Sequence, residues 1–214
     1  MIKILGRHTS YNVQKVLWLA EELNLNYEHK EVGGRFRGTD LSEFKALNPQ
    51  QKVPVIITSD GPIWESNTIL RYLASTYDQD NWIAKDAYQR SICERWMDWC
   101  LVTLEPAFVG VFWNYFRTPV EQRNMTLVND HIEKTERCLS LINDQIGDNT
   151  FFLGPSITLA DICVGVFLFR LATLDIDIQF PKNMQTWYDT LVQRKGYQKW
   201  VMSDYSELEG RVTY

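Results

Sequence analysis

The sequence predicts an α/β domain followed by an all-α domain, and three observations lead to this fold class. Up to about residue 77, short apolar runs alternate with segments of helical periodicity. Strand signals largely stop after the polar stretch 76–82, and a chain of 214 residues has enough core for two modest domains. We therefore expect a first domain at 1–78, a linker at 79–85 and an all-helical domain at 86–214.

The first domain is expected to form one four-stranded mixed sheet with helices on its faces. A strand, a helix and a second strand in succession form a right-handed crossover, so these two strands are parallel. The turn "SDGP" at 59–62 adds an antiparallel hairpin. The elements follow in the order βαβ-α-ββα, at residues 2–5, 13–23, 27–32, 40–47, 53–65 and 66–75.

Helical periodicity predicts the elements of the second domain, at residues 91–104, 128–146, 158–174 and 183–201. Asp86 followed by Gln89 has the spacing of a capping box for the first helix. Pro106 is expected to kink or end that helix, because proline cannot donate the helical hydrogen bond. Thr158 and Asp161 also have capping-box spacing, which favours a structural role over a catalytic one.

The composition argues against several classes of function. A net charge of −5 disfavours nucleic acid as the main partner, because phosphate binding needs clustered Lys and Arg. No apolar run approaches the ~20 residues that span a bilayer, and the N-terminus lacks a signal-peptide core, so we expect a cytoplasmic protein without membrane partners.

The four cysteines form no CxxC pair, and with three scattered histidines they give no zinc-ligand spacing. We expect buried thiols and no metal.

Four motifs carry a resemblance to a known family: "TSYNVQKV", "NPQQKVPVI", "WESNTILRYLA" and "SITLADICV". In this order and spacing, and over nearly the whole chain, they resemble the cytosolic glutathione transferases, in particular the bacterial theta-like and nu-like type with a hydroxyl active-site residue. The resemblance implies a thioredoxin-like first domain. It also implies a homodimeric detoxification enzyme with glutathione as co-substrate and no separate cofactor.

Ser10 occupies the position of the family's catalytic hydroxyl, at the start of a helix. Glutathione reacts as a thiolate, and a hydroxyl donor beside the positive end of a helix dipole stabilises that anion. Asn12 can offer a side-chain amide to the same sulfur. Two alternatives remain open: Ser10 caps the helix and nothing more, or the neighbouring Thr9 is the donor.

The resemblance implies further residues that hold the tripeptide. Val53 supplies main-chain hydrogen bonds to the cysteinyl group, and Pro54 follows a cis peptide bond; otherwise Pro54 simply begins a strand. Ser66 receives the γ-glutamyl carboxylate at a helix N-terminus, a role that can coexist with capping, while Glu65 attracts the ammonium group. The glycine carboxylate is assigned to Gln51 and Lys52, with Arg37 as a weaker candidate, against the alternative that these side chains are only solvated.

Three residues of the second domain complete the expected site. Trp113 and Phe116, in an aromatic-rich segment, either line an apolar pocket for the electrophile or pack in the core. Asp98 either reaches the ammonium group of the neighbouring subunit's glutathione or lies on a solvated helix face. The helices that begin near Ser66 and Asp86, with Trp96 and Trp99 on the second, are expected to pair the subunits.

The expected reaction is conjugation of glutathione to an electrophilic apolar substrate. Two alternatives stay open: reduction of a disulfide or hydroperoxide at the same site, and a non-catalytic adaptor with a transferase fold. A thioltransferase that forms a protein mixed disulfide is disfavoured because no cysteine lies near residue 10.

Overall fold

The structure is a computed structural model that describes residues 1–77 and 82–213. Contacts divide the chain into two compact units, Met1–Ile83 with Arg194–Ser203 and Ala84–Gln193 with Asp204–Tyr214. The expected domain at 86–214 therefore differs at residues 194–203, which pack on the first unit. Part of the expected linker, at residues 79–81, lies outside the described residues.

The first unit contains one mixed sheet that, within the described residues, has four strands in the order β2-β1-β3-β4. The strands are β1 (Ile2–Leu5), β2 (Tyr27–Lys30), β3 (Val55–Thr58) and β4 (Gly61–Trp64). β1 and β2 are parallel, whereas β3 is antiparallel to both β1 and β4. The predicted sheet, with its crossover and its hairpin, is confirmed.

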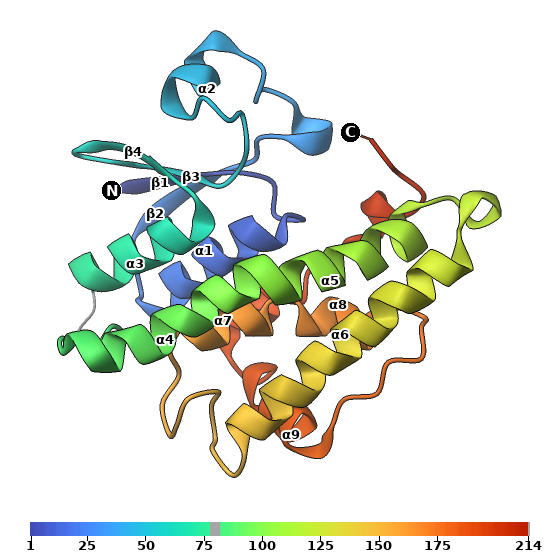
Figure 1. Ribbon diagram of the computed structural model, residues 1–214. Helices are drawn as coiled ribbons and strands as arrows, with labels where there is room; N and C mark the ends of the chain where they lie inside the picture. The colour runs from blue at the N-terminus through green and yellow to red at the C-terminus, as the bar shows by residue number, and fades with distance from the viewer. Residues whose placement is uncertain (78–81, 214) are drawn as a thin grey trace. The chain divides into compact units, whose positions relative to one another are not determined.

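Helices cover both faces of this sheet (Figure 1). They are α1 (Tyr11–Glu22), α2 (Ser42–Leu47) and α3 (Ser66–Tyr77). α1 and α3 lie side by side on one face, and α2 lies on the other. Val13, Val16 and Leu17 of α1 are fully buried, as the helical spacing of apolar residues predicts. This packing fixes the start of α1 relative to the sheet.

A segment near the C-terminus completes the first unit by packing on α1. Its π-helical part, η5 (Tyr197–Val201), places the Tyr197 ring edge-on against Trp18, with 4.8 Å between ring centroids. Gly196 permits a close approach, since a Cβ there would lie 2.8 Å from Cδ1 of Trp18. Arg194 donates from Nε to Glu22 Oε1 across 2.7 Å, a contact that periodicity cannot reveal.

The second unit is built from helices. They are α4 (Ala87–Trp99), α5 (Glu105–Val111), α6 (Met125–Ile146), α7 (Leu159–Gly165), α8 (Leu168–Thr173) and α9 (Lys182–Leu191). The expected helix 158–174 is divided into α7 and α8, and the expected helix 183–201 into α9 and η5. None of the described helices is both long and apolar enough to cross a membrane.

The sequence-based expectations for helix ends have mixed outcomes. Asp86 accepts a hydrogen bond from the Gln89 N–H at 2.9 Å, which confirms Asp86 as the cap of α4 but gives only one of the two bonds of the expected capping box. Pro106 does not end the helical course. A π-helical turn at Cys100–Leu104 leads directly into α5, and Pro106 lies in the first turn of α5, where its missing N–H costs little.

The capping box of Thr158 and Asp161 is confirmed at the start of α7. Asp161 is fully buried, and its carboxylate also accepts from Phe152 N–H at 2.8 Å and Trp187 Nε1 at 2.9 Å. Burial raises the pKa of Asp161, while these hydrogen bonds act in the opposite direction. The motif therefore joins three segments of the second unit, in keeping with a structural role.

Candidate active site

The sheet register brings the expected glutathione residues of the first unit to one end of the sheet. Leu5, the last residue of β1, pairs with Val55, the first residue of β3. Val55 in turn pairs with Trp64, the last residue of β4. The loop after β1, the segment before β3 and the start of α3 therefore meet at this end.

Ser10 lies where the loop after β1 becomes α1, with φ −88° and ψ 117°. Its side chain makes no capping hydrogen bond, although it occupies the N-cap position. Among the described residues no hydrogen bond of the Ser10 hydroxyl is found, and the residue is part-exposed. The neighbouring Thr9 is 1% exposed. The geometry thus favours Ser10 over Thr9 as a hydroxyl that can meet a ligand.

Asn12 and Ser66 are in direct contact. The Ser66 hydroxyl donates to Oδ1 of Asn12 across 3.0 Å. Ser66 begins α3 and is buried, whereas Asn12 lies part-exposed in the first turn of α1. The bond connects the starts of two helices whose N–H groups and dipoles favour an anion.

Val53 and Pro54 precede β3, and the peptide bond between them is cis, as the resemblance implied. The segment lies close to the end of β1: a Cβ on Gly6 would be 3.0 Å from Cβ of Val53 and 2.5 Å from Cγ2 of Val13. Glycine at position 6 is therefore what allows the strand, α1 and the proline segment to pack together.

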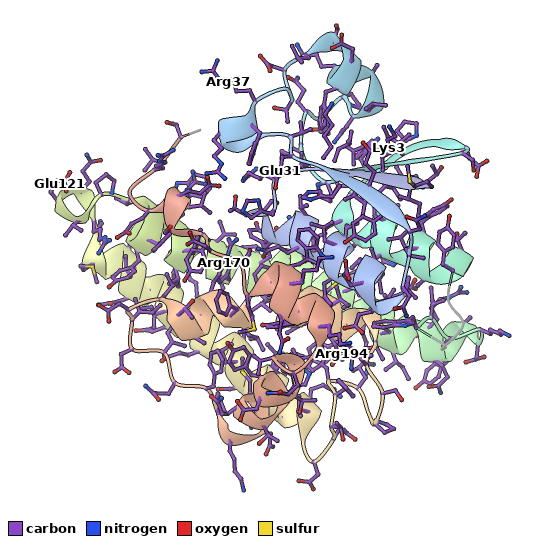
Figure 2. All side chains as sticks on the ribbon, turned by 180° about the vertical axis from the view of Figure 1, so that it is seen from behind. Lys3, Glu31, Arg37, Glu121, Arg170 and Arg194 are labelled. Atoms are coloured by element: carbon purple, nitrogen blue, oxygen red, sulfur yellow. The ribbon has the colours of Figure 1, made fainter. Side chains whose placement is uncertain are left out.

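The loop before Val53 is held by Asn48, which is 2% exposed. Its Nδ2 donates to the carbonyl of Lys52 across 2.8 Å, and its Oδ1 accepts from Gln50 N–H across 2.9 Å. The side chains of Gln51 and Lys52 remain exposed. Arg37 is also exposed, and Figure 2 shows its side chain pointing away from the ribbon.

Glu65 connects β4 to α3 with a backbone φ of 71°. This left-handed conformation disfavours side chains by about 1 kcal/mol or more, and it often occurs at functional positions. The Glu65 carbonyl accepts from Ile69 N–H across 2.9 Å, and the carboxylate side chain is exposed. A glutamate here places a negative charge immediately before Ser66.

In the second unit, the expected site residues have different surroundings. Phe116 is half-buried and packs against Phe112 and Tyr205, with ring centroids 5.2 and 5.1 Å apart. Trp113 is 39% exposed, and the Arg117 guanidinium lies 4.0 Å from its ring centroid. Core packing thus accounts for much of the Phe116 surface but less of Trp113. Asp98 is exposed on α4.

The cysteines have the surroundings expected of structural residues. Cys100, Cys138 and Cys163 are buried, and burial raises the pKa of the half-buried Cys93 thiol to about 11. Such a thiol is protonated at neutral pH and is a poor nucleophile. Over residues 1–77 and 82–213, no group of three or more His, Cys, Asp or Glu residues could hold a metal ion.

One pair that sequence reasoning missed lies beside this site. His8 Nδ1 is 2.5 Å from Oε1 of Glu31, and His8 N–H donates to Oε2 across 3.1 Å. Glu31 directly follows β2 and is labelled in Figure 2. The pairing of Leu5 with Lys30 in parallel strands puts the two following loops side by side. That parallel pairing, itself predicted, was the only signal in the sequence for the contact.

The fold and the site define a two-domain protein in which a thioredoxin-like domain carries a polar site at the starts of two helices. Residues 2–75 match the family model "Glutathione S-transferase, N-terminal domain", and residues 125–200 match "Glutathione S-transferase, C-terminal domain". Glutathione S-transferase GstB of Escherichia coli (strain K12) is 35% identical over 205 residues, which cover 94% of this chain and 98% of GstB. The chain belongs to the glutathione S-transferase family of enzymes, which confirms the resemblance in the motifs.

Two further comparisons extend this result. The theta class glutathione S-transferase from Xanthomonas axonopodis pv. citri, solved with glutathione bound, has 33% identity and a TM-score of 0.87, and the match covers 95% of this chain and 98% of that one. Elongation factor 1-gamma 3 of Oryza sativa subsp. japonica is 30% identical over 171 residues, which cover 78% of this chain and 40% of that protein.

Proposed function

We propose that the enzyme binds glutathione at the sheet end of the first unit and stabilises its thiolate with the Ser10 hydroxyl for attack on an electrophilic apolar substrate. The observation that carries this proposal is the Ser10 hydroxyl itself. It is part-exposed at the start of α1 and has no hydrogen bond among the described residues. A hydroxyl that served only as a cap would be bonded to its own helix.

The energy that this role requires matches what one hydroxyl can supply. A free cysteine thiol has a pKa of about 8.5, and lowering it by about two units needs ~2.7 kcal/mol of preference for the anion. A hydrogen bond to a charged group contributes ~1.5–3 kcal/mol. The dipole of α1 adds to this, because its positive end lies at Ser10. Asn12, two residues further on, is the second candidate donor.

The remaining groups of glutathione have complementary partners in the same unit. The main chain of Val53 is suited to the cysteinyl residue, beside the cis-Pro54 bond. The buried Ser66 at the start of α3 is suited to the γ-glutamyl carboxylate, and Glu65 to the ammonium group. The exposed Lys52 and Gln51 are suited to the glycine carboxylate. The theta class transferase from Xanthomonas axonopodis, solved with glutathione bound, supports glutathione as the ligand.

The second substrate is proposed to be a small apolar electrophile, in keeping with a cytoplasmic detoxification role. Trp113 is the better of the two aromatic candidates for contact with it, since Trp113 is 39% exposed whereas Phe116 is half-buried. Reduction of a disulfide or hydroperoxide would use the same thiolate. The raised pKa of Cys93 supports glutathione, rather than a protein thiol, as the nucleophile.

The decisive experiment measures glutathione binding by calorimetry, and initial rates with a chlorinated dinitroaromatic and with a mixed disulfide. We expect binding and a measurable rate with the aromatic substrate. Binding without turnover of either substrate would support the non-catalytic adaptor. A faster disulfide reaction would favour the reductase, and no binding at all would refute the proposal.

A further inference from the structure

We infer that Glu31 is a positioning residue for the thiolate site, holding through His8 the turn that presents the Ser10 hydroxyl. The inference rests on the proposed role of Ser10. Both carboxylate oxygens of Glu31 are engaged by this one residue, Oε1 by the His8 ring at 2.5 Å and Oε2 by the His8 main-chain N–H at 3.1 Å. Two contacts to one residue fix its orientation as well as its position.

The residue that Glu31 holds lies within the turn that leads to Ser10. Ser10 N–H donates to the Arg7 carbonyl across 3.0 Å, so His8 and Thr9 are the two central residues of a β-turn. Fixing the main chain at His8 therefore fixes the path of the chain into the N-cap of α1. The Ser10 side chain makes no capping bond that would orient it, so its placement depends on this backbone.

The Glu31 end of the Glu31–His8 contact is held by the sheet. Glu31 directly follows β2, and Gly6 N–H donates to the Lys30 carbonyl across 3.0 Å, which continues the β1–β2 pairing to the start of the loop. On another side, the Phe36 ring packs edge-on against His8, with 6.4 Å between centroids. The Glu31–His8 contact therefore fixes the turn at residues 7–10 relative to the sheet.

The pair is better suited to positioning than to stabilising the fold. Its side chains are 26% and 30% exposed, so solvent competes for the contact between the ring and the carboxylate. The hydrogen bond to the main chain keeps its geometric effect. A displacement of about 1 Å at a reacting group can cost ~10²-fold in rate, far more than the stability of a part-exposed pair would suggest.

The test compares Glu31→Ala with Glu31→Gln, and reads the pKa of bound glutathione from its thiolate absorbance together with kcat and KM. For Glu31→Ala we expect this pKa to rise by about one unit. At pH values below the thiol pKa, kcat/KM should then fall about tenfold, because the thiolate fraction there falls tenfold per unit. Glu31→Gln should retain most of the activity, since its amide oxygen still accepts from the His8 N–H.

Glu28→Ala is the matched control. Glu28 lies on β2 and pairs with Lys3 Nζ at 3.1 Å, with 44% of its side chain exposed. Its loss should leave the thiol pKa unchanged. If Glu31→Ala does not fold, Glu31→Asp takes its place: the shorter side chain cannot reach both His8 groups, so the same rise is expected in smaller measure.

The outcomes separate the possible roles of Glu31. An unchanged thiol pKa in a folded Glu31→Ala or Glu31→Asp protein overturns the inference and leaves a structural contact. A lowered pKa also overturns it, because that is the effect of removing a negative charge near the thiolate. Ser10→Ala keeps the two proposals distinguishable. If Ser10→Ala raises the thiol pKa and Glu31→Ala does not, only the inference fails; if Ser10→Ala has no effect, the proposed function fails.

Discussion

The Ser66 hydroxyl donates to Oδ1 of Asn12 across 3.0 Å, and so connects the residue proposed for the γ-glutamyl carboxylate to one proposed for the thiolate. A hydroxyl has a single hydrogen to donate. A carboxylate at Ser66 must therefore bind through the helix N–H groups or compete with Asn12 for that hydrogen. The bond also orients the Asn12 amide, because Oδ1 faces Ser66.

This contact predicts that substitutions of Asn12 and Ser66 are not independent. Ser66→Ala should raise the KM for glutathione more than it lowers kcat, because a carboxylate held equally throughout the reaction contributes uniform binding. In the double variant with Asn12→Ala, the combined effect on kcat/KM should be smaller than the product of the single effects. If the double variant loses as much kcat/KM as the product of the two single losses, the bond has no functional consequence. Unchanged glutathione affinity in folded Ser66→Ala would remove Ser66 from the site.

Replacing Ser10 by alanine should lower turnover by about 10²-fold, as expected for loss of one donor to a developing or stable anion. Glutathione should still bind, since the main-chain and helix-terminus contacts remain. Steady-state kinetics and calorimetry on the same protein check both statements. Asn12→Ala is the comparison, with a smaller expected effect; a much larger loss there would make Asn12 the main thiolate donor.

Much of this site could be predicted from sequence because its residues follow strands and begin helices. The short apolar runs and the turn at 59–62 predicted the sheet, and the sheet register determines which loops meet. The His8–Glu31 pair could not be identified in this way, since 23 residues separate its members and either side chain has other plausible orientations.

The boundaries of the second unit were less accessible to prediction. Segment 194–203 continues a helical pattern, yet it packs on α1 through Gly196 and the Arg194–Glu22 ion pair, which are individual contacts without a period. The break between α7 and α8 is hidden for another reason. All residues of α7 are buried, and a helix that is buried on every side shows no amphipathic period that marks where it ends.

The close approach at Gly196 predicts a stability effect. Gly196→Ala would place a Cβ 2.8 Å from Cδ1 of Trp18 and 3.2 Å from its carbonyl oxygen, so one of the segments must shift. Overpacking of this kind costs about 1–3 kcal/mol. Urea unfolding should show a lower midpoint, whereas Met202→Ala, at a residue 37% exposed, should change it little. A Gly196→Ala midpoint equal to that of the native enzyme would contradict the observed packing.

Asp161→Ala should destabilise the enzyme by about 3–5 kcal/mol, because it leaves the buried donors of Phe152 and Trp187 and the part-buried N–H of Thr158 without an acceptor. Asp161→Asn keeps one acceptor oxygen and should cost less. Chemical unfolding of both variants measures the difference. Equal stability of Asp161→Ala and the native enzyme would show that these hydrogen bonds do not hold the three segments together.

The same residue predicts a pH dependence. Burial raises the pKa of Asp161 above the value of 3.8 that it has when unfolded, so the folded state binds this proton more tightly. Its contribution to stability is then greatest below pH 3.8 and declines as the pH rises through the folded pKa. Asp161→Asn removes the titration, and its stability should decline less over this range than that of the native enzyme. Parallel pH profiles would show that Asp161 does not titrate differently on folding.

The final prediction concerns a homodimer built on α3 and α4. Trp96 and Trp99 lie in contact on α4, with 5.1 Å between ring centroids, and neither is fully buried, so they offer apolar surface to a second subunit. Light scattering at micromolar concentration should give twice the chain mass of 25.1 kDa.

In such a dimer, Asp98→Ala should weaken glutathione binding, because the exposed carboxylate is proposed to reach the ammonium group bound by the partner. Asp189→Ala, at an acid on α9 bonded to Gln185, is the control and should leave binding intact. A monomer would refute the dimer, whereas a dimer with unchanged affinity in Asp98→Ala would refute only the role of Asp98.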